Sequence, residues 1–487
     1  MYFLGVDFGG GSCKATLLSS FGKVITEASS EYPTQYTADG GACQNPSDWI
    51  KSALECIKTV LKSVRAEEIK CVCFSAATHT AVLLGADGNP LCPSVYWTDT
   101  RSAPDARELN DICGDEIRRK TLHSPSPVWT IAQLRFISRV SPETMRFVKR
   151  ITFAKDYVRG FFTGDFVTDR IEAAGSMFYD VAENRWDSRL CSLAGISEEV
   201  LPKLNEPLDT AGYVTFSAAE ASGLKEGTLV ITGCTDTAAE VFAAGCINKG
   251  DASVKFATAG RICVISDGPV VNENVINYTH LKKGLWYPGS ATKSCAASLR
   301  WFRDAFGGDY GALDTEALNT NAGADGLLFH PYLSGELTPY NLPSMRGAFN
   351  GVTGIHRKGH FARAVMEGAA FSMRHCLDSI RKSGLDAGDK AVFLGGAAKS
   401  ALWRQIAADI LEMELTVRKH CDSSFGGAML AGIGAGAFKD TDEAFKVCRP
   451  EEITVYPDEK NREVYKEAFA RYLSFAEFYK EFYGAKQ

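Results

Sequence analysis

The sequence predicts an α/β protein built from two related halves. Strand patterns alternate with long helical patterns along the 487 residues, and this alternation is typical of α/β folds. A three-stranded meander is predicted at residues 2–7, 12–19 and 24–30, with a glycine turn after its first strand. The same strand, glycine turn and strand return at residues 251–267. A pattern that recurs half a chain later indicates a duplicated domain.

The first half continues with a helix over residues 47–64, for which Ser47 is the expected N-cap. A buried strand follows at residues 69–77. Residues 81–97 are predicted to form a hairpin, because the letters DGN in their middle are typical of a tight turn. Residues 103–205 are mainly helical in pattern.

The second half repeats the alternation. A strand at 228–236 and a helix at 238–247 are predicted just before it. Within it we expect a helix at 361–382, a strand, glycine turn and helix at 390–411, and a small-residue helix at 425–438. We expect the boundary near residues 243–250. The predicted domains are therefore 1–245 and 246–487.

Composition excludes several classes of function. A net charge of −6 gives no electrostatic argument for binding nucleic acid or an anionic membrane. No apolar run approaches the ~18 residues of a membrane span, and no signal peptide is expected. The fifteen cysteines show no C-x-x-C spacing, which is typical of reduced thiols. We therefore expect a cytoplasmic protein with reduced thiols.

The glycine run of Gly9 to Gly11, which follows Asp7, indicates a phosphate site of a particular kind. P-loops and dinucleotide turns open a helix, whereas the next residues here, SCKATLL, have a strand pattern. A hairpin whose turn amides face a phosphate remains, since glycine permits positive φ and close backbone approach. Asp7 is then placed to hold Mg²⁺, directly or through water. The alternative is a plain tight hairpin in which Asp7 only caps the turn; the second glycine turn, at residues 258–261, favours the nucleotide.

Six segments together resemble the FGGY carbohydrate kinases, and most of all their xylulokinase branch, in order and spacing from Tyr2 to about Gly436. They are GVDFGGGSCKATLL, SAATHTAVLLGADGNPLCPSVYWTDTR, FAKDYVRGFFTGDFVTD, GCTDTAAEVFAAGCINKGDASVKFATAG, HPYLSGELTPYNLPSMRGAF and LGGAAKSALWRQIAADI. The resemblance implies two ribonuclease-H-like domains of the actin and hexokinase type around a central cleft. It places sugar mainly on the first domain and ATP mainly on the second, and it leaves a homodimer open, as the family often forms dimers.

Asp236, in GCTDTAAE, matches the family's catalytic aspartate. A carboxylate within hydrogen-bond reach can accept the proton of a sugar hydroxyl as that hydroxyl attacks the γ-phosphate. The alternative role is the N-cap of the helix that follows. Asp7 matches the family's second acid, which orders Mg²⁺–ATP and so helps to neutralise charge on the transferred phosphoryl group.

On the sugar side, the resemblance implies contacts from Thr78, His79 and Thr237, in addition to Asp236. A histidine at a strand end can bond two hydroxyls, one through each nitrogen. Trp97, Asp99 and Arg101 match the family's W-x-D-x-R. They line the sugar pocket or, equally well, form a structural ion pair.

For ATP, the resemblance implies two glycine hairpins and a third turn. The residues are Gly9, Gly10, Gly11, Ser12, Lys14, Thr258, Ala259, Gly260, Gly395, Gly396, Ala397 and Ser400. Ser400 contacts the base or ribose, or only caps the next helix. Trp403 is expected in the core.

The chain departs from the family's pattern at several of these positions. Hydroxyl residues are usual at Gly10 and Gly11, and Ser is usual at Ala259. These three changes concern the affinity for ATP. The other departures bear on the sugar: Asn is usual at Thr237, Met at Thr78, Gly at Thr80 and Arg at Leu337.

The predicted function is transfer of the γ-phosphoryl group of ATP to a terminal hydroxyl of an open-chain ketose or polyol. D-xylulose, converted to D-xylulose 5-phosphate, is the leading substrate by resemblance, with ribulose, another pentulose or a tetritol left open. The departures leave a catalytically weak sugar- or nucleotide-binding regulator as an alternative. An actin- or chaperone-like ATPase is a third hypothesis, and the sugar-side segments THTAV and WTDTR count against it.

Overall fold

The computed structural model describes residues 1–272 and 274–484. They form two compact units. The first unit holds residues 1–247, 278–284 and 420–449, and the second holds the remainder. The predicted boundary at 245/246 falls two residues before the first segment ends, but the two later segments return to the first unit and a single boundary does not describe this division.

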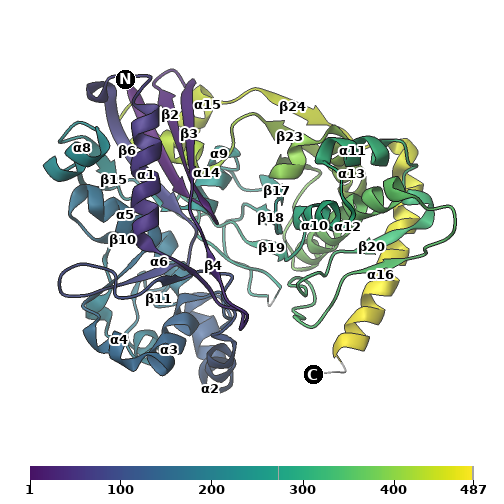
Figure 1. Ribbon diagram of the computed structural model, residues 1–487, viewed down its shortest axis with the longest axis horizontal. Coiled ribbons are helices and arrows are strands. Elements are labelled where there is room, and N and C mark those ends of the chain that lie inside the picture. The colour runs from purple at the N-terminus through teal and green to yellow at the C-terminus, as the bar shows by residue number, and fades with distance from the viewer. Residues whose placement is uncertain (273, 485–487) are drawn as a thin grey trace. The chain divides into compact units, whose positions relative to one another are not determined.

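The first unit is built on a seven-stranded sheet in the order β14-β15-β6-β1-β2-β3, with β16 also paired to β6 (Figure 1). β1, β2 and β3 are antiparallel, whereas β1 and β15 run parallel to β6. The bounds are β1 Tyr2–Phe8, β2 Ser12–Ser19, β3 Val24–Glu31, β6 Ile69–Ala76, β14 Thr210–Tyr213, β15 Leu229–Ile231 and β16 Cys234–Thr235. The predicted meander and buried strands are confirmed.

The second unit repeats this sheet. Its order is β19-β18-β17-β22-β23-β24, with an antiparallel meander, two parallel neighbours and an antiparallel last strand. The bounds are β17 Ala252–Phe256, β18 Gly260–Val264, β19 Gly289–Thr292, β22 Lys390–Leu394, β23 Glu414–Arg418 and β24 Glu452–Val455. Equal strand order and equal directions confirm the predicted duplication.

Alternation along β1 explains how helices cover both faces of the first sheet. Leu4, Val6 and Phe8 join a core with residues of α1 (Pro46–Val60). The intervening Gly5 faces α14 (Ser423–Gly434), so that α1 and α14 lie on opposite faces. The N-cap of α1 is Asn45, whose side chain accepts a hydrogen bond from the Ser47 amide, so the prediction of Ser47 as N-cap is wrong by two residues.

Small residues let α14 approach the sheet closely. A Cβ at Gly5 would lie 2.0 Å from the carbonyl oxygen of Ser424, and one at Gly426 would lie 2.1 Å from that of Ala239, in α9 (Asp236–Ala243). The glycines of this helix are thus explained by packing.

The predicted hairpin at 81–97 forms only beside its turn, where Leu84 and Pro90 make an antiparallel bridge and the Leu91 amide donates to the Leu83 carbonyl at 2.8 Å. β7 (Ala81–Leu84) pairs with β9 (Arg150–Phe153), and β8 (Ser94–Val95) pairs with β5 (Ala42–Gln44). The DGN turn does form, with the Gly85 amide bonded to the Asn89 carbonyl at 3.0 Å. Its second arm holds Pro90 and Pro93, which have no N–H to donate to a ladder.

The region 103–205 is mainly helical, as predicted. Its helices are α2 Ala103–Thr121, α3 Thr130–Val140, α4 Pro142–Phe147, α5 Ala154–Thr163, α6 Arg170–Ser176 and α7 Ser188–Leu193. α8 Phe216–Ser222 and α15 Thr441–Cys448 complete the helices of the first unit. Its short strands are β4 Gln35–Tyr36, β10 Val167–Asp169, β11 Tyr179–Asp180, β12 Arg185–Trp186 and β13 Lys203–Asn205.

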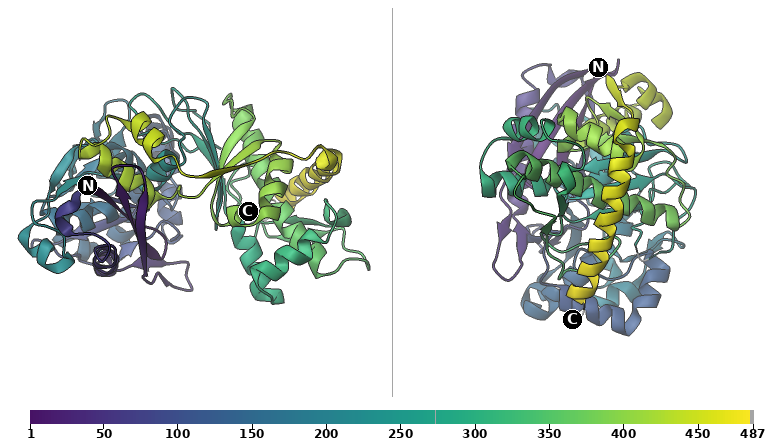
Figure 2. Two further views of the ribbon diagram at one scale, coloured as in Figure 1. Left: turned by 90° about the horizontal axis from the view of Figure 1, so that it is seen from above. Right: turned by 90° about the vertical axis from the view of Figure 1, so that its right-hand side faces the viewer.

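Helices of the second unit surround a core centred on α12 (Lys358–Lys382), the long helix predicted at 361–382. The others are α10 Ala296–Phe306, α11 Tyr310–Leu318, α13 Ala401–Leu411 and α16 Arg462–Gly484, with β20 Leu328–His330 paired to β21 Ala348–Asn350. α16 packs against α13 and β20 and is seen along its length in Figure 2. Within the described residues, no helix combines the length and apolarity of a membrane span.

Candidate functional site

Three strands of the first sheet end at one place. Asp7 on β1 lies opposite Ser75 on β6, and Thr235 on β16 lies opposite Ala76 on the other side of β6. The carboxyl ends of parallel strands meet at the same edge of a sheet. Asp7 and Asp236 therefore flank the end of β6, from which Thr78 and His79 continue.

The electrostatics of this edge are negative. The buried Ser75 hydroxyl donates to Asp7 Oδ1 at 2.7 Å. Burial raises the pKa of Tyr32, and the nearby charges of Asp7 and Asp236 raise it further. The same two carboxylates help to raise the pKa of Tyr96, again after burial. The charges of Asp7 and Asp236 are therefore both felt at the same two phenols, those of Tyr32 and Tyr96.

Asp236 is the first residue of α9, and it is not the cap of that helix. The cap is Thr235, whose hydroxyl accepts from the Ala238 amide at 3.3 Å. Asp236 Oδ1 accepts from the amide of Thr237 at 2.5 Å. A carboxylate in a first helical turn is stabilised by the helix dipole. The structure removes the N-cap alternative and leaves Asp236 half-buried at the strand edge.

His79 is held on every side. Its φ of +72° is rare for a residue with a side chain. Its amide donates to Glu172 Oε1 at 3.0 Å, and its carbonyl accepts from the Thr130 hydroxyl at 3.0 Å. Nδ1 lies 2.7 Å from the carbonyl oxygen of Gly175, and Nε2 lies 3.0 Å from the hydroxyl of Tyr278. Both ring nitrogens therefore already have protein partners, which corrects the expectation that each bonds a sugar hydroxyl.

Three further rings surround His79, and the sequence did not single them out. Trp129 meets it edge-on at 4.6 Å between centroids, His123 stacks on Trp129 at 4.3 Å, and Tyr278 lies 5.8 Å from His123. Gly175 packs beneath, where a Cβ would lie 2.6 Å from Thr78 Cγ2. These residues come from distant segments, so no local pattern in the sequence marks them.

Asp99 and Arg101 form an ion pair, at 2.6 Å between Nη2 and Oδ2. Asp99 is buried and also accepts the amides of Ala42, at 2.8 Å, and of Arg101, at 2.9 Å. This arrangement favours the structural alternative for the pair. Trp97 is 37% exposed, and its contact with sugar stays a prediction.

The first glycine turn has two amides that find no acceptor among the residues that the structure describes. The Gly9 amide closes the turn on Ser12, and all three glycine carbonyls accept bonds, among them those from Tyr32 Oη to Gly9, at 2.6 Å, and from Thr34 to Gly10, at 3.0 Å. Within the described residues, the amides of Gly10 and Gly11 have no acceptor. None of the three glycines has a positive φ, so the expected conformational reason for glycine is wrong here. The turn keeps two donors for an anion.

Lys14 has a different role from the predicted one. Its ammonium pairs with Asp422 at 2.5 Å and with Glu27 at 2.7 Å. Asp422 caps α14, so Lys14 ties β2 to that helix. We therefore leave Lys14 out of the candidate ATP residues; Ser12 begins β2, next to the turn.

The turn of the second unit repeats these features. The carbonyls of Ala257 and Thr258 accept amides at the start of α10, at 2.7 to 3.3 Å. The amides of Thr258 and Ala259 have no acceptor within the described residues. Gly260 has no room for a side chain, because its Cβ would lie 2.2 Å from Met373 Sδ.

The third predicted turn lies at the same edge of the second sheet. β22 runs parallel to β17, and a Cβ at Gly395 would lie 2.3 Å from the carbonyl oxygen of Phe256. Gly396 begins a short 3₁₀ turn that includes the buried Ala397. Ser400 caps α13 by accepting the amide of Trp403, and Trp403 is buried in the core.

The donor set at the first edge fits Mg²⁺. Carboxylate oxygens with water completing the shell suit this hard cation, and Asp7 supplies such oxygens. Within the described residues, no group of three or more His, Cys, Asp or Glu forms a ready-made metal cluster. Mg²⁺ bound with phosphates needs only one or two carboxylates, so this donor set is sufficient.

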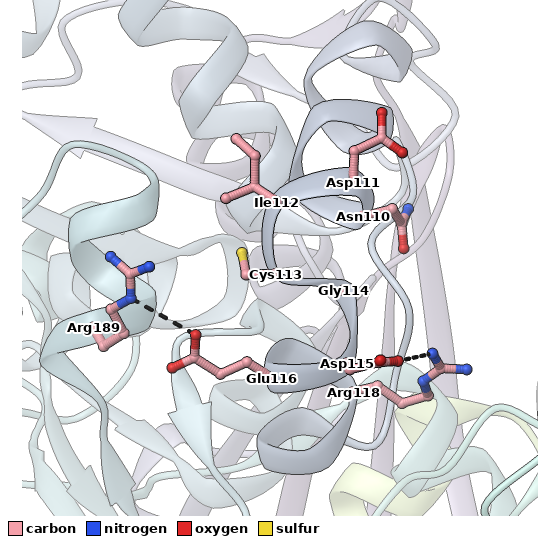
Figure 3. Close-up of a pocket in the computed structure, with 9 residues that line it drawn as sticks. All are labelled: Asn110, Asp111, Ile112, Cys113, Gly114, Asp115, Glu116, Arg118 and Arg189. Carbon is pink, nitrogen blue, oxygen red and sulfur yellow. Dashed lines mark hydrogen bonds and ion pairs between the residues drawn. The ribbon is translucent and has the colours of Figure 1, made fainter.

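A surface hollow of about 400 Å³ lies elsewhere, where α2 is broken at Cys113 (Figure 3). Four of its charged side chains form two ion pairs, Arg118 with Asp115 at 2.6 Å and Arg189 with Glu116 at 3.7 Å. None of the predicted site residues lines it.

The duplicated sheets, with glycine turns at equivalent strand ends, have the two-domain actin- and hexokinase-like fold of sugar kinases. The model of the FGGY family of carbohydrate kinases, N-terminal domain, matches residues 2–243, and that of the C-terminal domain matches residues 256–435. The chain belongs to the FGGY family of carbohydrate kinases.

Its relatives differ in the substrate that they are named for. A xylulose kinase of Bacillus subtilis is 30% identical over 97% of this chain and 96% of its own. A gluconokinase of Bacillus subtilis is 28% identical over 91% of this chain and 89% of its own. A crystal structure of a "xyloylose kinase" from Brucella ovis has a TM-score of 0.89 at 27% identity, with 98% of each chain covered. The chain is therefore a sugar kinase, similar to xylulose kinases.

Proposed function

We propose that this kinase transfers the γ-phosphoryl group of ATP to a terminal hydroxyl of a neutral open-chain ketose or polyol, with D-xylulose as the leading acceptor. The observation that carries the proposal is the position of Asp7 and Asp236 on either side of the end of β6, beside Thr78 and His79.

Asp236 acts as the general base. A sugar hydroxyl is a weak nucleophile, and a carboxylate within hydrogen-bond reach accepts its proton during attack on phosphorus. Asp236 lies in the first turn of α9, where the helix dipole favours a negative charge. Thr237, the next residue, is proposed to contact the sugar from the same turn.

The phosphates are bound by amides and by Asp7. In the part of the chain that the structure describes, the amides of Gly10 and Gly11 in the first unit, and those of Thr258 and Ala259 in the second, have no acceptor, and each pair is suited to phosphate oxygens. Mg²⁺, when bound, neutralises charge that develops on the transferred group. Asp7, held by Ser75, is the residue that would hold this ion.

Charge distinguishes the two acceptors named among the relatives, because gluconate carries a carboxylate and D-xylulose does not. Two cations of the first unit are paired with protein carboxylates, Arg101 with Asp99 and the buried Lys155 with Asp156 and Asp169. Asp7 and Asp236 repel an acid. This distribution supports a neutral acceptor.

The proposal is tested by ADP release with ATP and Mg²⁺ over a panel of D-xylulose, D-ribulose, a tetritol, glycerol and gluconate. We expect D-xylulose to be the best acceptor and Asp236→Asn to lower kcat by about 10² to 10⁴. Asp115→Asn, on the exposed face of α2, is the matched control. Unchanged turnover in Asp236→Asn would contradict the assignment of the base, and gluconate as the best acceptor would contradict the neutral substrate.

A further inference from the structure

Tyr278 reaches the sugar side of the first unit from a distant part of the chain. Residues 278–284 belong to the first unit, although the residues on either side belong to the second. Its hydroxyl lies 3.0 Å from Nε2 of His79, which precedes it by 199 residues. The ring is half-buried, with one side against Trp129 and His123. No local pattern in the sequence points to this contact.

The segment that carries Tyr278 is firmly anchored. His280 is buried, with Nε2 3.0 Å from the carbonyl oxygen of Cys246. Arg170 donates to the carbonyl of His280 at 2.6 Å, and Lys282 pairs with Asp442 at 2.7 Å. The phenol is therefore placed before any ligand arrives.

The protons of this contact can be assigned. A carbonyl only accepts, so the 2.7 Å contact with Gly175 requires the proton of His79 to be on Nδ1. Nε2 is then the acceptor, and Tyr278 donates its only proton to it. Burial, which lowers the pKa of His79 to about 4, keeps the ring neutral near pH 7 and preserves this pattern.

We propose that Tyr278 is a specificity-determining residue of the sugar site, whose phenol oxygen accepts a hydrogen bond from one hydroxyl of the acceptor. The inference rests on the proposed function. With its proton committed to His79, the oxygen offers only lone pairs. It therefore favours groups that donate, such as alcohols, and disfavours a carboxylate, which only accepts.

The first experiment combines a variant with altered acceptors. Tyr278→Phe removes the hydroxyl and keeps the ring. The matched control is Tyr179→Phe, because the hydroxyl of Tyr179 donates to Asn184, at 3.1 Å, rather than to His79. We expect Tyr278→Phe to raise KM for the preferred sugar about 3- to 10-fold. Each monodeoxy analogue of that sugar is then compared between the two enzymes.

For one hydroxyl of the acceptor, its removal in the monodeoxy analogue is expected to raise KM in the wild type but not in Tyr278→Phe. Such non-additivity identifies a direct contact, whereas a merely structural role would weaken every analogue alike. As a second measurement, NMR titration of His79 in the sugar-free protein is expected to show a higher pKa in Tyr278→Phe, because Nε2 loses its donor.

The outcomes separate this inference from the proposed function. If the wild type phosphorylates a sugar, and Tyr278→Phe does so with the same KM and the same analogue profile, the role of Tyr278 is overturned and the kinase assignment stands. If the wild type phosphorylates no acceptor of the panel, the proposed function fails, and the role of Tyr278 falls with it.

Discussion

Ser75 on β6 donates its hydroxyl to Asp7 on β1, across the parallel pairing of the two strands, at 2.7 Å. Ser75 is fully buried, whereas Asp7 is half-buried at the strand end. A buried donor with a fixed backbone orients the carboxylate that faces the phosphates in the proposed function. Ser75 is thus a positioning residue.

Removal of this donor should weaken catalysis without unfolding the protein. We expect Ser75→Ala to lower kcat by about 10-fold or more, since hydrogen bonds to charged groups contribute ~1.5–3 kcal/mol. Steady-state kinetics over a range of Mg²⁺ concentrations measure the effect. Ser52→Ala is the control, because that buried hydroxyl bonds carbonyls of its own helix. Equal kcat for Ser75→Ala and the wild type would show that Asp7 needs no such support.

Gly395 and Gly396 form a matched pair in the second unit. Gly395 has φ +92°, and its Cβ would lie 2.3 Å from a backbone oxygen, whereas a Cβ at Gly396 meets nothing within 4 Å. We expect Gly395→Ala to cost at least ~2 kcal/mol of unfolding free energy and to raise KM for ATP. Gly396→Ala should leave both close to wild type. Urea unfolding measures the first quantity and steady-state kinetics the second. Equal unfolding free energies and equal KM values for ATP in the two variants would contradict the structure.

The strands and both acids were predictable because their evidence is local. Short apolar runs indicate β1 and β2, and Asp7 and Asp236 directly follow buried runs. The pairing of β7 with β9 was not predictable, since the DGN turn suggested a nearer partner. Tyr278 and Trp129 were missed for the same reason: packing across the chain brings them to His79, and no spacing records it.

The first glycine turn has room for a hydroxyl that it lacks. Gly11 has no positive φ, and the nearest atom to a Cβ there would be the Tyr32 carbonyl oxygen at 3.8 Å. We expect Gly11→Ser to fold normally and to lower KM for ATP about 2- to 10-fold by adding one donor. Gly5→Ser is the contrasting variant, because its Cβ would clash with α14 and unfold the unit. A higher KM for ATP in Gly11→Ser would argue against phosphate at this turn.

Lys155 maintains a buried charge network beneath the sugar-side residues. Its ammonium pairs with Asp169 at 2.8 Å and also with Asp156, and all three side chains are fully buried. Lys155→Met would leave the buried Asp169 without its cation and Asp156 paired with Arg159 alone, so we expect a loss of about 3–5 kcal/mol of unfolding free energy. Exposed Lys70→Met is the control. Denaturant unfolding measures the difference, and a loss below ~1 kcal/mol would show that the network relaxes around the missing charge.

Stability should fall in mild acid because several histidines are buried. Burial lowers the pKa of His330 to about 4, as it does for His79, His280 and His375. As the pH falls below ~6.5, these histidines become protonated in the unfolded chain, whereas in the folded chain they stay neutral until about pH 4. The unfolding free energy therefore decreases between these two pH values. For His330 alone the decrease is about 3 kcal/mol. His330→Gln cannot take up this proton, so it should lose less stability than wild type between pH 7.5 and pH 5, measured by urea unfolding at both values. Equal losses in the two proteins would show that His330 is protonated as readily in the folded state as in the unfolded one.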